Sequence, residues 1–89
     1  MTVAERRVTV ASPVGLHARP AARFVTAAAA FDGEVYLARP GGPRVSAASM
    51  LAVLTLGVRG GEEIVITAEG DGAEELLDRL AEIAACTAD

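Results

Sequence analysis

The sequence is poor in cysteine and aromatic residues, and each shortage excludes a class of function. Because Cys86 is its one cysteine, neither an internal disulfide nor a structural zinc site can form. Aromatic residues make up 3% of the chain, which argues against binding nucleic acid by base stacking. The net charge of −4 has the wrong sign for contact with a phosphate backbone. We therefore expect no nucleic-acid partner, no metal ion and no cofactor.

Long apolar runs are also missing. No uninterrupted stretch approaches the roughly 18–20 residues that a membrane-spanning helix needs, and no apolar signal-peptide core follows residues 1–7. The 89 residues are 52% hydrophobic, which is enough to bury a core and too apolar for a disordered chain. These features predict a single cytoplasmic domain over residues 1–89 that does not insert into a membrane.

Hydrophobic periodicity predicts seven elements in the order β-α-β-β-α-β-α. The predicted strands cover residues 6–11, 34–38, 44–46 and 63–68, and a tight reversal at residues 39–43 joins the middle two. The predicted helices cover residues 18–31, 49–56 and 71 onward. Because hairpin-connected strands mix with helices, we expect an α+β fold with an antiparallel sheet and the helices on one face.

Apolar side chains at helical spacing predict which helix faces are buried. In the first helix they are Ala18, Ala21, Ala22, Val25, Ala28 and Ala29. In the last helix they are Leu76, Leu77, Leu80, Ile83 and Ala84. Asp71 and Glu74 have the spacing of a capping box, which predicts the start of this last helix.

The single histidine, His17, lies where the first helix begins, in the segment Gly15-Leu16-His17-Ala18-Arg19-Pro20. Proline suits a first helical turn, where its missing N–H has no intrahelical acceptor. The N–H groups of a helix start attract anions, and Arg19 and Arg23 add positive charge nearby. A neutral imidazole is a competent nucleophile, so this arrangement suits reversible phosphoryl capture. The alternative is a surface or core histidine without chemistry.

Three segments resemble motifs of one family, the histidine-containing phosphocarrier proteins (HPr) of the bacterial sugar phosphotransferase system. Residues 15–21 resemble its active-site signature, residues 49–57 its serine-site helix, and residues 60–70 its last strand and turn. The motifs occur in the family's order and span nearly the whole chain. The resemblance implies an open-faced β-sandwich, in which a four-stranded antiparallel sheet of order 1-4-2-3 is covered on one face by three helices.

The resemblance also implies a role for each residue of the first motif. His17 would accept a phosphoryl group from phosphorylated enzyme I and pass it to a IIA unit of a sugar permease. Arg19 would counter the charge of the transferring group, and the backbone N–H groups of Ala18 and Arg19 would help to hold it. The chain would then be a phosphoryl carrier and not a turnover enzyme, since the protein supplies position and electrostatics.

The helix expected at residues 49–56 is apolar on nearly all sides, although a two-layer fold buries one side. We expect Met50, Leu51 and Leu54 to form an exposed docking patch for enzyme I and IIA units. Arg23 would add local positive charge suited to acidic partner faces. The alternative for each apolar residue is ordinary core packing.

Ser49 corresponds to the family's regulatory serine, which a dedicated kinase phosphorylates in some bacteria. It could equally cap the helix and do nothing else. This chain has Ala48 where a lysine is common in the family, and Ala52 where many members have glycine or lysine. Regulatory phosphorylation, by a kinase partner, and helix capping therefore both stay open here.

Other functions remain possible on the sequence alone. An acylphosphatase-like enzyme has a similar size and an arginine phosphate site, but it would turn over acyl phosphates without a stable phosphoprotein. An HPr-like regulatory adaptor would act by binding enzymes or transcriptional regulators. A nitrogen-branch phosphocarrier would share the chemistry and differ in its partners. We expect a monomer that binds its partners transiently.

Overall fold

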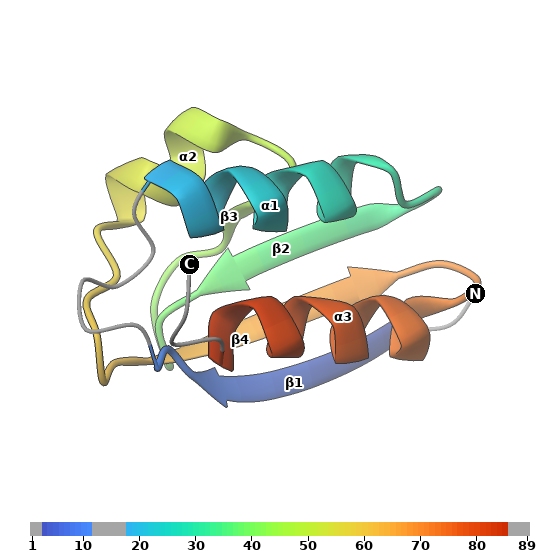
Figure 1. The fold of residues 1–89 in the computed structure, drawn as a ribbon. Coiled ribbons are helices and arrows are strands. Elements are labelled where there is room, and N and C mark those ends of the chain that lie inside the picture. Colours follow the sequence, from blue (N-terminus) through green and yellow to red (C-terminus); the bar gives the residue numbers. More distant parts are fainter. Residues whose placement is uncertain (1–2, 12–17, 86–89) are drawn as a thin grey trace.

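The computed structural model describes residues 3–11 and 18–85, with the backbone alone for residues 18–20. Its elements follow the predicted order β-α-β-β-α-β-α (Figure 1). They are β1 (Val3–Thr9), α1 (Ala18–Ala29), β2 (Glu34–Ala38), β3 (Val45–Ser46), α2 (Met50–Leu56), β4 (Glu63–Glu69) and α3 (Ala73–Ala85).

The four strands form one antiparallel sheet in the order β1-β4-β2-β3, as expected. The strand β4 pairs on one side with β1, where Val8 faces Ile64, and on the other with β2, where Leu37 faces Ile66. Because β4 is the last strand in the sequence and lies between β1 and β2, it brings the first strand into the same sheet as the hairpin of β2 and β3. The open-faced sandwich predicted from the resemblance is confirmed.

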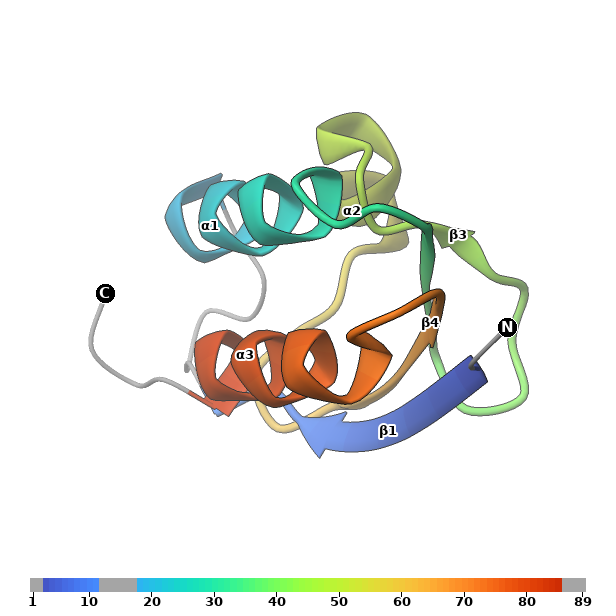
Figure 2. The same cartoon turned by 90° about the vertical axis from the view of Figure 1, so that its right-hand side faces the viewer.

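The helices lie on one face of the sheet, and α1 packs against both α2 and α3 (Figures 1 and 2). The helix α3 covers β1 and β4, while α2 contacts β3. The largest fully buried side chains fill the space between the layers and are Phe24, Leu37, Ile64, Ile66, Leu77, Leu80, Val10 and Val53. Burial of these apolar side chains is the main favourable contribution to folding.

The first strand begins earlier than the periodicity predicts. It spans Val3–Thr9 and not residues 6–11, because β4 extends to Glu69 and pairs with Val3 there. Val10 lies beyond the strand but is still held, since its N–H donates to the Glu62 carbonyl (2.9 Å) and its carbonyl accepts from the Gly61 N–H (2.8 Å). The pairing partner, and not the local pattern, sets the strand's bounds.

Two details of the helices also differ from the predictions. Ala22 and Ala29 of α1 are exposed, so their predicted burial is wrong, and Phe24 is buried instead. The predicted capping box is also wrong, because the Leu76 N–H donates to the Gly72 carbonyl (3.0 Å), which makes Gly72 the N-cap of α3. The predicted apolar stripe of α3 is confirmed, since all five of its side chains are buried.

Candidate functional site

The predicted phosphoryl acceptor lies at the edge of what the structure describes. His17 is outside the described residues, as is the Arg19 side chain, so the structure does not test their roles. The backbone shows that α1 spans Ala18–Ala29, and its first turn contains no acidic residue. The first N–H groups of a helix lack intrahelical acceptors and carry partial positive charge. The structure therefore confirms a helix start directly after His17, whereas the anion site there stays a prediction.

Buried side chains on the inner face of α1 hold this first turn in place. Ala21 and Phe24 have no exposed surface, and Ala28 continues the same stripe one turn later. Their spacing keeps one face of the helix against the core. The first turn of α1 thus continues into a helix that is packed against the core.

The helix α2 begins and ends where the sequence predicts. The Ser49 hydroxyl accepts a hydrogen bond from the Ala52 N–H (3.2 Å), so Ser49 is the N-cap. Gly57 adopts a left-handed conformation (φ 65°), and its N–H donates to the Leu54 carbonyl (3.1 Å). Capping by Ser49 is confirmed, whereas its phosphorylation stays a prediction.

Two of the three predicted docking residues lie on the exposed side of α2, together with Thr55. Leu51 is 77% exposed and Leu54 is 40% exposed. Met50 is partly buried and packs against the core, so it is not a freely exposed member of the patch. On the inner side of α2, the Val53 side chain is buried. We use "docking surface" below for Leu51 and Leu54.

Arg23, the remaining predicted contributor to docking, lies on α1. It is exposed and borders a groove between α1 and α3, next to Arg79 and Glu82. The groove is lined mostly by residues of α1 and α3, whereas the docking surface lies on α2. The lining of this groove includes Arg23 but neither Leu51 nor Leu54, and a role of Arg23 in docking stays a prediction.

An ionic contact between Arg39 and Glu62, which was not predicted from the sequence, lies at the far end of α2. The Arg39 Nε donates to Glu62 Oε2 (2.8 Å), its Nη1 to the Leu56 carbonyl (2.5 Å) and its Nη2 to the Gly57 carbonyl (2.9 Å). The Glu62 Oε1 accepts from the Arg59 N–H (2.8 Å). These bonds join the end of β2, the end of α2 and the loop before β4. The available signal was Glu62 itself, an acidic residue that directly follows the Gly-Gly pair at residues 60–61.

The same contact lowers the pKa of the Glu62 carboxyl group and so links the stability of the fold to pH. Hydrogen bonds from Arg39 and from the Arg59 N–H hold the pKa of Glu62 below its ordinary value of 4.5. A carboxyl group whose pKa is lower in the folded state stabilises the fold above the unfolded pKa. It loses that contribution as the pH falls through the folded pKa.

We therefore expect Glu62→Gln to reduce the loss of stability that the native protein shows as the pH falls below about 4.5. Urea unfolding between pH 6 and pH 3 would measure how the free energy of unfolding changes with pH. Glu75→Gln, which removes an exposed carboxylate from α3, is the matched control and should leave the pH slope close to that of the native protein. Equal slopes for the native protein and Glu62→Gln would contradict the prediction.

The described part of the chain has neither a metal-binding cluster nor a membrane-spanning helix. Within residues 3–11 and 18–85, no group of three or more histidine, cysteine, aspartate or glutamate side chains could hold a metal ion. In the same ranges, no helix has the length and hydropathy required to cross a bilayer.

Comparisons with known proteins agree with this geometry. A family model described as the PTS HPr component phosphorylation site matches residues 4–85. The chain is 55% identical over 83 residues to phosphocarrier protein HPr of Streptomyces coelicolor, which covers 93% of this chain and 89% of that relative. It is 52% identical over 80 residues to phosphocarrier protein HPr of Haloferax volcanii, with coverage of 89% and 90%. The crystal structure of a phosphocarrier protein HPr from Bacillus anthracis matches with a TM-score of 0.86 at 37% identity, covering 94% of this chain and 99% of that one.

Proposed function

The chain belongs to the HPr family of the phosphotransferase system, and from that membership we infer that it carries phosphoryl groups on His17. In this proposal His17 accepts the group from phosphorylated enzyme I and passes it to a IIA unit of a sugar permease. The observation that carries the proposal is the helix α1, which spans Ala18–Ala29 directly after the histidine.

The proposed step needs a nucleophile and a place for the charge. The ring nitrogen of His17 nearer the backbone forms a bond to phosphorus as the bond between phosphorus and enzyme I breaks. The Ala18 and Arg19 N–H groups and the Arg19 guanidinium would hold the phosphoryl oxygens. In the second transfer, a nucleophile of the IIA unit forms a bond to phosphorus as the bond between phosphorus and His17 breaks, which leaves His17 free to accept again.

The chemistry favours a carrier over a catalyst that hydrolyses the group. A phosphohistidine bond is labile, so the group moves on without a large barrier once a second nucleophile is in line. The protein's contribution is position and electrostatic stabilisation. We place this exchange in the cytoplasm, with the protein acting as a monomer that meets its partners transiently.

Incubation with radiolabelled phosphoenolpyruvate and enzyme I tests the proposal. We expect a label on this chain that is lost in acid and stable in base, as a phosphohistidine is. Addition of a IIA unit should then remove the label. No label in the presence of active enzyme I would contradict the proposal, and so would an acid-stable phosphoester formed in its place.

We also propose that the docking surface contacts both partners, because Leu51 is a large apolar side chain that is 77% exposed. Replacing Leu51 with glutamate should lower kcat/KM for enzyme I and for the IIA unit by about tenfold or more, the effect of a central interface residue. Steady-state transfer kinetics would measure the change.

Val3→Glu is the matched control for this substitution. Val3 is also an exposed apolar side chain, at 62%, but it lies on β1 and away from α2. Its replacement adds the same charge to the protein and should leave both transfers unchanged. Equal rates for Leu51→Glu and the native protein would exclude the docking surface.

A further inference from the structure

We propose that Arg39 and Glu62 are positioning residues for partner docking, because they fix the end of α2 that carries Leu54 to the central strands of the sheet. The inference rests on the proposed function, since it assumes that α2 presents the docking surface. It assigns a role to two side chains that lie outside the docking surface itself.

The helix α2 needs such support because it is short. It has seven residues, whereas isolated helices below about 12–15 residues are marginal in water. Within α2, Val53 is the one side chain that is buried. Met50 and Leu56 pack against the core only in part, so the hydrogen bonds at the two ends of α2 help to fix the helix, and Ser49 holds the first end.

The Arg39 guanidinium holds the second end. Its two terminal nitrogens donate to the carbonyls of Leu56 and Gly57, the last residue of α2 and its C-cap. A cation at this end also suits the negative pole of the helix dipole. Since Arg39 directly follows β2, the guanidinium extends from a strand inside the sheet.

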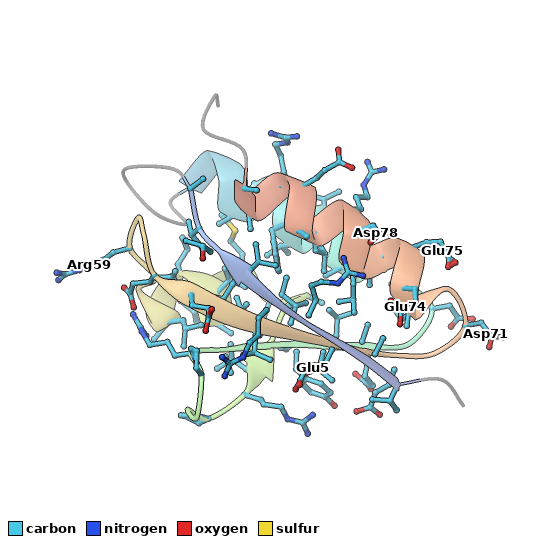
Figure 3. The ribbon with its side chains drawn as sticks, turned by 90° about the horizontal axis from the view of Figure 1, so that it is seen from below. Glu5, Arg59, Asp71, Glu74, Glu75 and Asp78 are labelled. Atoms are coloured by element: carbon cyan, nitrogen blue, oxygen red, sulfur yellow. The ribbon has the colours of Figure 1, made fainter. Side chains whose placement is uncertain are left out.

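Glu62 completes the attachment from the neighbouring strand. It directly precedes β4, and its carbonyl accepts a hydrogen bond from the Val10 N–H (2.9 Å). Its carboxylate orients Arg39 (2.8 Å) and also accepts the Arg59 N–H (2.8 Å), which closes the loop between α2 and β4. The side chain of Arg59 projects outward from this loop (Figure 3).

The attachment reaches the docking surface through one further bond. The Gly57 N–H donates to the Leu54 carbonyl (3.1 Å), so Leu54 is one hydrogen bond from a residue that Arg39 holds. Loss of Arg39 would let the last turn of α2 fray and Leu54 change its position. The start of α1 does not take part in these bonds. We therefore expect weaker docking with unchanged phosphoryl chemistry.

The test is transfer kinetics of Arg39→Gln and Glu62→Gln with phosphorylated enzyme I, at a temperature where circular dichroism shows both variants folded. We expect KM to rise about fivefold in each, while kcat stays close to that of the native protein. Arg39→Lys should raise KM less than Arg39→Gln, because lysine keeps the positive charge. Its KM should still exceed that of the native protein, because one ammonium cannot reach all three acceptors as the guanidinium does. A variant that only lowered stability would lose active protein and kcat, without a selective change in KM.

Arg44→Gln is the matched control, since it removes the same charge from the same hairpin. Arg44 stacks over the Tyr36 ring (4.2 Å) and lies apart from the carbonyls that end α2, so its KM should equal that of the native protein. Leu51→Glu distinguishes failure of the positioning role from failure of the docking surface. If Leu51→Glu raises KM and Arg39→Gln does not, the positioning role is wrong. If Leu51→Glu also leaves KM unchanged, the docking surface itself is wrong.

Discussion

Replacing His17 with alanine is expected to reduce phosphoryl uptake from enzyme I to the level seen without enzyme I. The substitution removes the ring nitrogen that forms the bond to phosphorus, and no positioning of the remaining groups can replace a missing nucleophile. The chain has one histidine, so the variant has no second imidazole that could take the group. The loss should therefore be complete and not partial.

The measurement is the label retained on the chain after incubation with phosphoenolpyruvate and enzyme I. Circular dichroism and urea unfolding of the same sample show whether the variant is folded, and a competition assay shows whether it still binds enzyme I. We expect it to fold and to inhibit transfer to native protein, because the docking surface lies on α2 and is unchanged. Acid-labile label on the variant would overturn the assignment of His17.

The elements with strong local signals were predictable from the sequence. Strand β2 has the predicted bounds, and α2 ends at the predicted residue, because Ser49 and Gly57 each suit one helix end for a local reason. Proline and arginine after His17 likewise indicated a helix start with positive charge. In these cases the residue and its chain neighbours determine the structure.

Features that depend on distant partners were not predictable. Arg39 and Glu62 are 23 positions apart and meet because β2 and β4 are neighbours in the sheet. The start of β1 depends on the length of β4. The buried face of α1 was misplaced because alanines occupy several faces of this helix, so their spacing does not distinguish the face that Phe24 buries.

Phe24 leads to the largest expected effect on stability. Its side chain has no exposed surface and lies in the core cluster with Leu77 and Leu80 of α3. Truncation of a buried phenylalanine to alanine costs about 3–5 kcal/mol, from lost burial and from the cavity that remains. At about 0.05–0.15 kcal/mol per residue, a domain of this size has a total stability of about 4–13 kcal/mol. Phe24→Ala should therefore remove roughly a quarter of the stability or more.

Urea unfolding should show a lower midpoint for Phe24→Ala with an unchanged slope, since a similar surface is exposed on unfolding. Phe31→Ala is the matched control, because it removes the same atoms from a side chain that is partly buried and should cost less. Phosphoryl uptake should fall in step with the unfolded fraction of Phe24→Ala, because α1 carries the residues that follow His17. A smaller loss for Phe24→Ala than for Phe31→Ala would show that Phe24 does not anchor this helix.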